Sequence, residues 1–385
     1  MPGYAGWLLL LGVLGTAAAS AAEPEPPYKT HFRPINVHLH CGQPSAAAVR
    51  AELAVCDRTG IDKVVILDGG SPPGSLPKWL ELKRQFSDRL IVFYKLDLRN
   101  VARPGFFVDI VTELEEAAQS GVQGVKVWKD LGMYNQDGEG KLLAMDDPRL
   151  DPFFARCGEL GLPVMIHAAD PREYWHPLTY HSLHYGLRTE ADQHYHNPAM
   201  PKWEELIRQR DHVLEKHPRT NFIGAHLGSL CQDLERLGRT FEKHPNFHAD
   251  CAARLRFLGR LNPPAVRAFF IKYQDRLLFG TDDGILSKGR RPGQAGNISL
   301  YPADDPNWLW HDPADEAAVR DWKEKHTWFY SQYLQYFETD RLDLSDPSRS
   351  GGAWLRIPAV QLPAEVLEKF YRTNAERLIP GLRAK

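Results

Sequence analysis

Several short apolar segments of this chain end in side chains of types that can bind metal ions. The side chains at these segment ends are His38 and His40, His167, His226 and Asp282. Residues two apart on a β-strand point to the same side, so His38 and His40 can share one ligand. Imidazole and carboxylate groups suit zinc, manganese, iron and nickel. These residue types and spacings therefore indicate a metal centre, provided that the fold brings the segment ends together.

From residue 35 onward, short β-branched runs alternate with longer segments of helical periodicity. The predicted strands are Ile35–His40, Lys63–Leu67, Leu90–Lys95, Gly124–Trp128, Pro163–His167, Asn221–His226, Phe247–Asp250 and Arg276–Thr281. The predicted helices between them are Ala46–Thr59, Leu76–Phe86, Phe106–Ser120, Pro148–Leu160, Trp203–Lys216, Leu230–Lys243 and Pro264–Tyr273. This alternation indicates a parallel sheet, and its eight units predict a (β/α)8 TIM barrel. The strands of such a barrel place their carboxyl ends on one face, where we expect the metal centre.

Two connections are longer than the rest, residues 168–201 after the fifth strand and residues 283–313 after the eighth. Both leave carboxyl ends of strands, and long loops at that face are typical of functional segments. A final helix is predicted over residues 362–378. We expect residues 35–385 to form a single domain.

Residues 1–22 have the pattern of a secretory signal peptide, an apolar run followed by small residues. The run is too short for a stable membrane anchor, and the proline-rich residues 23–34 are predicted to be a linker. We therefore expect a periplasmic or secreted protein. The five cysteines show no close pairing pattern, so no disulfide framework is predicted. A net charge of −2 argues against nucleic acid as a partner. The expected partner is a small-molecule substrate, with a homodimer left open.

The combined motifs resemble the amidohydrolase superfamily. They are His38-x-His40, a histidine after each of strands five and six, and Gly280-Thr281-Asp282. The chain is most similar to the branch that contains aminocarboxymuconate-semialdehyde decarboxylase and resorcylate-type decarboxylases, and its final helix fits that branch. The resemblance implies that His38, His40, His167 and Asp282 hold the metal, most simply one zinc. It also implies that His226 transfers protons beside a metal-activated water, whose pKa falls from about 16 toward about 7.

Two lysines of the fourth strand allow more than one interpretation. Lys126 lies where binuclear members of the superfamily carry a carboxylated lysine that bridges two metals. Alternatively it is unmodified and binds an anionic substrate group, or it is structural and paired. Lys129, nearer the strand end, competes with it as a substrate contact.

Weaker candidates for substrate contact follow strands seven and five. Asp250 ends the seventh strand and Arg254 follows one turn later. The guanidinium could hold a substrate carboxylate in a bidentate manner, or the two residues could form a structural pair. The loop after the fifth strand is rich in histidine and aromatic residues, among them Trp175 and His176. It is interpreted as a lid or pocket wall, with an interface or a second metal site as alternatives.

The motifs predict an enzyme, and two reactions fit them. The first is hydrolysis of an amide, lactone or ester by a metal-activated water. The second is non-oxidative decarboxylation, a C–C bond cleavage on the same scaffold. A barrel that only binds a ligand is the third alternative, but a degenerate site would be expected to lose some of its polar strand-end residues.

Overall fold

The computed structural model describes residues 28–41, 44–71, 73–183, 190, 193–284, 316–345 and 356–382. The predicted signal peptide and most of the loop predicted after the eighth strand lie outside these residues. Within them, no helix is both long enough and apolar enough to cross a membrane.

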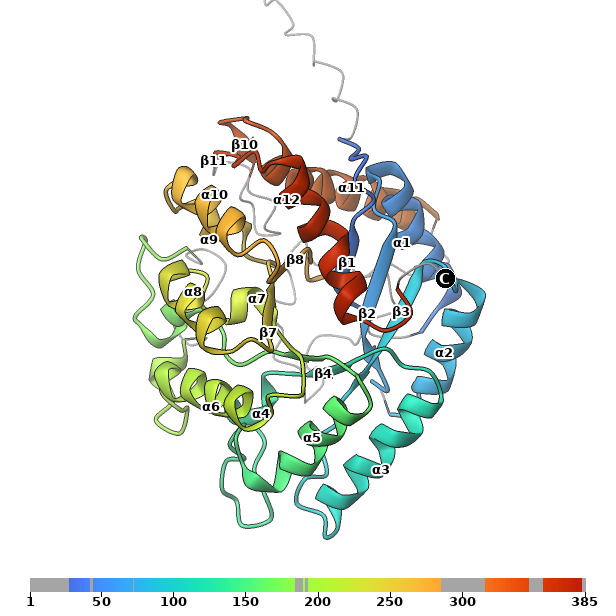
Figure 1. Ribbon diagram of the computed structural model, residues 1–385, viewed down its shortest axis with the longest axis vertical. Coiled ribbons are helices and arrows are strands. Elements are labelled where there is room, and N and C mark those ends of the chain that lie inside the picture. Colours follow the sequence, from blue (N-terminus) through green and yellow to red (C-terminus); the bar gives the residue numbers. More distant parts are fainter. Residues whose placement is uncertain are drawn as a thin grey trace, which may run out of the picture.

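A single parallel sheet forms the centre of the molecule (Figure 1). Its strands are β1 (Ile35–His40), β2 (Lys63–Gly69), β3 (Leu90–Lys95), β4 (Val125–Val127), β5 (Val164–Ile166), β6 (Phe222–Gly224), β7 (Phe247–Asp250), β8 (Leu277–Leu278) and β9 (Asp283–Gly284). Neighbouring strands follow the order β8-β7-β6-β5-β4-β3-β2-β1-β9, so each strand from β1 to β8 lies beside the next in sequence. The predicted strands are therefore confirmed in order, and those from β4 to β6 are shorter than predicted.

The sheet closes on itself through a break in the eighth strand. We predicted one strand over residues 276–281, but β8 ends at Leu278 and pairing resumes in β9. The N–H of Val37 donates to the Phe279 carbonyl at 2.9 Å, and Asp283 lies opposite Leu39 in the parallel pair of β9 with β1. Both halves of the broken strand thus contact β1, which closes the ring and confirms the TIM barrel.

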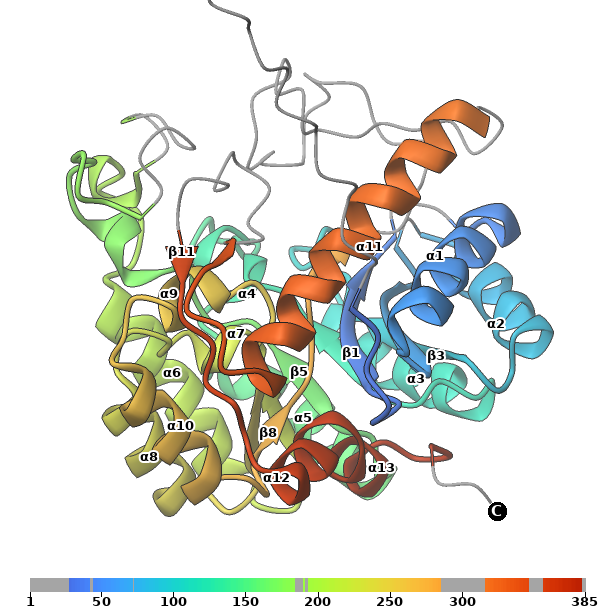
Figure 2. The same cartoon turned by 90° about the horizontal axis from the view of Figure 1, so that it is seen from above.

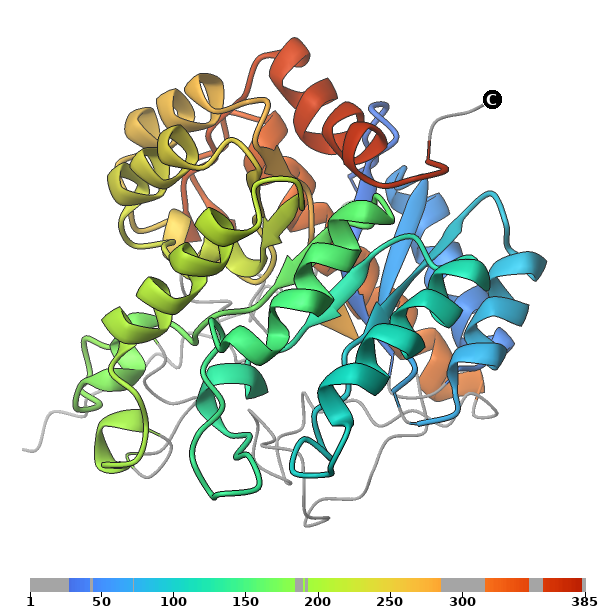
Figure 3. The ribbon, with the colours of Figure 1, turned by 60° about the horizontal axis from the view of Figure 1, so that its bottom comes forward.

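Helices surround the barrel, as Figure 3 shows. Those after the first seven strands include α1 (Ala46–Thr59), α2 (Leu76–Gln85), α3 (Phe106–Gln119), α5 (Asp151–Glu159), α6 (Trp203–Lys216), α8 (Leu234–Lys243) and α10 (Pro263–Lys272). Short turns of helix also occur, among them α4 (Asp130–Met133), α7 (Ala225–Gly228), α9 (Leu255–Leu258) and the 3-10 turns Pro148–Leu150, Arg172–Trp175 and His194–His196. The main discrepancy is α8, predicted to begin at Leu230. It begins four residues later, because the Asp233 side chain caps it by accepting from the N–H of Arg236 at 2.9 Å.

The C-terminal part of the chain adds two features to the barrel (Figure 2). The helix α11 (Glu316–Glu338) has 23 residues, packs against α1, and had no counterpart in the sequence-based prediction. The predicted final helix is present as α12 (Ala364–Glu368), a π-helical turn over Lys369–Thr373, and α13 (Asn374–Leu378). Leu378 and Ile379 pack with interior residues such as Ile35, so this end of the chain plugs the barrel at the amino ends of the strands.

Candidate metal centre

A β-bulge in β1 turns His38 and His40 into the mouth of the barrel. The register of β1 against β2 shifts by one residue in the middle of the strand. Before the shift, Val37 packs in the barrel interior, whereas beyond it Leu39 packs in the layer under the outer helices. A bulge re-aims the side chains that follow it. Regular alternation from an inward Val37 would have pointed both histidines outward.

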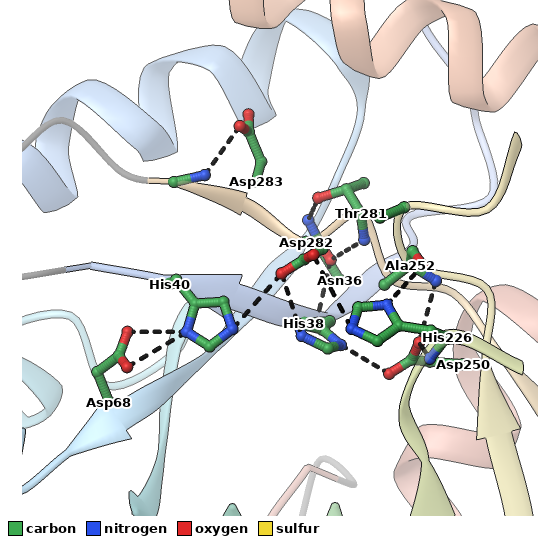
Figure 4. A network of polar contacts seen from close by, with 12 residues as sticks. Asn36, His38, His40, Asp68, His226, Asp250, Ala252, Thr281, Asp282 and Asp283 are labelled. Carbon is green, nitrogen blue, oxygen red and sulfur yellow. Dashed lines mark hydrogen bonds and ion pairs between the residues drawn. The ribbon is translucent and has the colours of Figure 1, made fainter. Parts of the chain in front are cut away.

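Asp282 lies at the centre of the arrangement, on the break between β8 and β9. Its Oδ1 atom is 3.3 Å from Nε2 of His38 and 3.5 Å from Nε2 of His40. Its Oδ2 atom is 4.0 Å from Nε2 of His226 (Figure 4). The ligand atoms of His38, His226 and Asp282 all lie within 4.8 Å of one another. The fold therefore gathers histidines that lie in β1 or follow β6 around one carboxylate that follows β8.

The three histidines share one hydrogen-bond pattern. The Nδ1 atom of each lies beside a fixed acceptor, so the proton of the neutral ring belongs on Nδ1 and the lone pair on Nε2. Three lone pairs then face the Asp282 carboxylate, an arrangement that positive charge between them would stabilise. The Nδ1 distances are 2.8 Å from His38 to Asp250, 3.1 Å from His40 to Asp68 and 2.8 Å from His226 to the Ala252 carbonyl.

The pKa shifts of Asp282 and His38 also indicate that the site favours a positive charge. Burial disfavours ionisation of Asp282, but the His38, His226 and His40 rings outweigh it and hold the pKa of this carboxyl well below its usual range. Burial and the Lys126 ammonium lower the pKa of His38, yet Asp250 and Asp282 outweigh them and raise it above the usual value. The carboxylates thus favour a positive charge at Nε2 of His38. A divalent cation held by these nitrogen and oxygen atoms fits that requirement.

His226 is aimed by an unusual backbone turn. Residues His226 to Ser229 all have left-handed conformations, with φ values of 62°, 57°, 59° and 63°. Such a run is costly for residues other than glycine and persists only where the surroundings fix it. Ser229 Oγ donates to the Ala169 carbonyl at 2.6 Å, and the buried Arg210 guanidinium donates to the Gly228 carbonyl. The N–H of His226 donates to Asp250 at 2.9 Å.

His167 and Lys126 lie beside the cluster, and each has a free polar atom. The ring of His167 is 4.4 Å from that of His226 between centroids, and its buried Nε2 has no hydrogen-bond partner among the described residues. Lys126 is fully buried opposite the interior residue Met165, and its Nζ is likewise unpartnered in the described structure. Burial lowers the pKa of Lys126 to about 8, although Asp250 raises it. The structural, paired interpretation of Lys126 is therefore wrong.

Lys129, the second lysine near the end of the fourth strand, is paired within the described structure, unlike Lys126. The Lys129 ammonium lies 2.6 Å from Asp170, whose other oxygen is 2.8 Å from Nε2 of His194. This buried pair neutralises Lys129 within the protein, and its interpretation as a competing substrate contact stays a prediction. In the loop after β5, Trp175 donates to the Pro201 carbonyl at 2.8 Å, and His176 is exposed. These loop contacts do not include the cluster around Asp282.

Asp250 and Arg254 do not form the structural pair that we had considered. Both Asp250 oxygens are engaged within the protein, one by His38 and the other by the N–H groups of His226 and Ala252. Asp250 therefore supports the imidazoles, and its interpretation as a substrate contact is also wrong. The Arg254 side chain is buried, donates to the Ala253 carbonyl, contacts the Cys231 thiol, and pairs with no carboxylate in the described part of the chain. Its charge helps to lower the pKa of His226, after burial.

One residue of the site, Asp68, was missed by the sequence analysis. It follows the apolar run of β2, just as the selected residues follow their own strands. A second register shift, between β2 and β3, occurs beside it. Besides His40, Asp68 accepts from the N–H of Cys41 at 2.7 Å. Burial opposes its ionisation, but His40 and Lys95 lower its pKa to about 2. The signal available was its position at a strand end, without a motif to mark it.

The chain was also compared with known proteins. A family model described as amidohydrolase matches residues 37–381. No curated protein sequence matches the chain significantly. Similar solved structures include an uncharacterised TIM-barrel protein of Bordetella bronchiseptica, at 14% identity over 89% of this chain and 98% of that one, with a TM-score of 0.48. Another is 5-carboxyvanillate decarboxylase of Novosphingobium aromaticivorans with bound manganese, at 14% identity over 92% and 97% of the two chains, with a TM-score of 0.43.

A third similar structure is a probable 2-pyrone-4,6-dicarboxylic acid hydrolase of Acinetobacter baumannii. It is 13% identical over 77% of this chain and 94% of that one, with a TM-score of 0.40.

Proposed function

Because the chain belongs to the amidohydrolase family, a family of enzymes, we propose that it is a metal-dependent hydrolase that cleaves an amide, lactone or ester bond of a small molecule. The observation that carries this proposal is the convergence of three imidazole Nε2 atoms on the Asp282 carboxylate. A buried carboxylate surrounded by nitrogen lone pairs is stabilised by a positive charge held between them. Their histidine and carboxylate composition is that of catalytic zinc sites.

We infer that His38, His40 and Asp282 hold one divalent cation and that His167 is a further ligand. In support, the same Asp282 oxygen faces the first two rings, and Nε2 of His167 is buried with no hydrogen-bond partner in the part of the chain that the structure describes. Zinc suits this donor set best, with manganese, iron and nickel as alternatives. When bound, such a cation would polarise a substrate carbonyl and lower the pKa of a water molecule toward about 7.

His226 is the proposed acid–base residue. It faces the Asp282 oxygen that is turned away from His38 and His40, and it is the most distant of the three rings. Burial, and then Arg254, lower the pKa of His226 well below its usual value, so the ring is neutral and ready to accept a proton at Nε2. Asp282 then has two roles, because one oxygen holds the cation and the other orients the proton-transfer ring.

Lys126 is proposed to act as an unmodified amine that attracts an anionic part of the substrate. Its location among buried carboxylates, with no hydrogen-bond acceptor among the described residues, supports this role. The alternative is a carboxylated Lys126 that bridges two cations, a modification that begins with the neutral amine. Zinc stoichiometry measured with and without bicarbonate separates the two, because only the bridged form would bind a second, bicarbonate-dependent equivalent.

Arg254 is the proposed binding residue for a substrate carboxylate. A guanidinium matches a carboxylate in geometry, and a buried one without an acidic partner is costly unless a ligand neutralises it. We expect Arg254→Met to raise KM for a carboxylated substrate about 10- to 100-fold, since a charged hydrogen bond contributes about 1.5–3 kcal/mol. Steady-state kinetics with the carboxylate and its methyl ester measure this effect.

The neutral ester should respond little to Arg254→Met. The exposed Arg260 lies in the same stretch of chain, so Arg260→Met is the matched control and should leave both KM values unchanged. Equal losses for the acid and the ester would contradict the assignment of Arg254.

Decarboxylation is the second candidate, because two buried cations beside the site, Lys126 and Arg254, have no acidic partner within the described ranges and so favour a substrate that carries a carboxylate. Zinc-loaded protein should be incubated with carboxylated lactones, esters and amides and with phenolic acids, while acid release and CO2 are followed. We expect ring opening or bond hydrolysis without CO2. Release of CO2 from a phenolic acid would assign the lyase activity instead. Failure to bind any transition metal, together with no turnover, would favour a ligand-binding barrel.

The place of action is a separate proposal. We infer export to the periplasm or the exterior from the signal-peptide pattern of residues 1–22, and cleavage after this segment would leave a mature chain that begins near Glu23. A homodimer stays a prediction that size measurement in solution can check.

A further inference from the structure

The helix α11 presents a row of buried polar side chains to the barrel. His326, Tyr330 and Tyr333 are spaced four and three residues apart, so they lie on one face of the helix. Their exposed fractions are 6%, 0% and 2%. A helix that only covered the barrel would be expected to bury apolar side chains on this face. The polar row therefore needs partners inside the fold.

These side chains contact the residues on either side of Asp282. Nδ1 of His326 pairs with the Asp283 carboxylate, and the Tyr333 hydroxyl donates to the Thr281 carbonyl at 3.5 Å. Tyr330, between them on the helix, donates to the buried Glu52 of α1 at 2.6 Å and also contacts Thr281. The row thus connects α11 to the segment that carries the proposed metal ligand.

The segment from Thr281 to Asp283 is held from the opposite side by β1. Asn36 donates to Thr281 Oγ1 at 2.9 Å and accepts from the Thr281 N–H at 3.1 Å. The N–H of Asp282 donates to the His38 carbonyl at 2.9 Å. Asp282 itself has a left-handed φ of 60°, a conformation that the contacts on both flanks help to hold.

We propose that His326 is a positioning residue for the metal centre, acting through Asp283 to orient the Asp282 carboxylate. This inference rests on the proposed function. Asp283 is 1% exposed, and its side chain pairs with His326 of α11. Figure 4 shows that Asp283 points away from the histidines that the neighbouring Asp282 faces. Without His326, the buried Asp283 carboxylate would lose a hydrogen-bond partner, and the segment would shift to rehydrate it. A shift of Asp283 moves Asp282, because the two are consecutive residues on a strained turn.

The test is the affinity of the full chain for zinc, measured on metal-free protein by competition with a chromophoric chelator. We expect His326→Leu to weaken zinc binding about 10- to 100-fold, as is typical when a residue that orients a ligand is removed. His326→Asn keeps an N–H near the position of Nδ1 and should recover most of the affinity. Tyr333→Phe removes the contact with Thr281 and should cause a smaller loss in the same direction.

Ser331→Ala is the matched control, since Ser331 lies on the same helix but donates to the Tyr28 carbonyl at 3.3 Å and not to the Thr281–Asp283 segment. It should leave zinc affinity unchanged, even though loss of the Tyr28 contact lowers the thermal unfolding temperature of metal-free protein. Wild-type affinity in His326→Leu, or an equal loss in Ser331→Ala, would overturn the proposal. Should His326→Leu not fold, His326→Asn and Tyr333→Phe decide it, and wild-type affinity in both would overturn it.

The zinc-affinity measurements also test the role of His326 separately from the proposed hydrolase activity. Wild-type protein that binds zinc but hydrolyses nothing would overturn the hydrolase assignment, while the affinity series would still support or overturn the role of His326. Wild-type protein that binds no zinc would overturn both.

Discussion

Asp282→Asn is expected to abolish stable zinc binding and to lower turnover by on the order of 10³-fold or more, because activation of water by a metal supplies several kcal/mol. Asparagine has nearly the shape of aspartate and, like it, tolerates a left-handed backbone, so the φ of 60° at this position can persist. What is lost is the negative charge that His38, His40 and His226 surround. Metal analysis after gel filtration, together with the hydrolysis rate, measures both effects.

A chelator supplies the internal comparison for Asp282→Asn. Wild-type protein stripped of metal should fall to the activity of the variant, and added zinc should restore the wild type alone. A variant that kept its zinc and more than about a tenth of its turnover would show that Asp282 is not a ligand, since loss of a metal-bound carboxylate is expected to cost far more.

His226→Asn is expected to lower kcat about 10²- to 10⁴-fold while zinc content stays at the wild-type level, which is the usual effect of losing a general acid–base residue. Asparagine is again the appropriate replacement, because it adopts the left-handed conformation that residue 226 requires. The variant loses the Nε2 atom that faces Asp282 but leaves His38 and His40 in place. Zinc analysis and steady-state kinetics on the same preparation measure zinc content and kcat together.

His226→Asn should give a different result if His226 is itself a metal ligand. The ligand atoms of His226, His38 and Asp282 form a compact group, so His226 could itself be a ligand. In that case His226→Asn would lose zinc and turnover together, and the proton-transfer role would be wrong. His212→Asn is the control, since this exposed histidine of α6 pairs with Asp146 and not with any residue of the site. It should change neither quantity.

Much of the barrel could be predicted from the sequence because its strands and helices are local patterns. The bounds of β1, β3, β7, α1 and α6 agree with the predicted ranges. Each of these segments carries enough apolar periodicity or β-branched character to define itself. The helix α11 could not be predicted in this way, since its inner face carries His326, Tyr330 and Tyr333, whose burial depends on partners elsewhere in the chain.

The site, like the fold, could be predicted from the sequence only in part. The sequence by itself determined which residues stand at the carboxyl ends of the strands, because a parallel barrel places those ends on one face. The tertiary structure alone decided how the side chains point. The bulge in β1 turns His38 and His40 inward, and the left-handed turns aim His226 and Asp282. Register shifts and positive φ values are set by pairing with distant segments, so no local pattern specifies them.

Only the tertiary structure also decided which charges are neutralised. Lys129 and Arg254 looked equivalent in the sequence, as cations just beyond strand ends. Lys129 pairs with Asp170, whereas Arg254 has no acidic partner in the described structure because its expected partner, Asp250, is fully used by His38 and His226. The availability of a buried charge depends on which groups pack around it in three dimensions, and those groups come from separate strands.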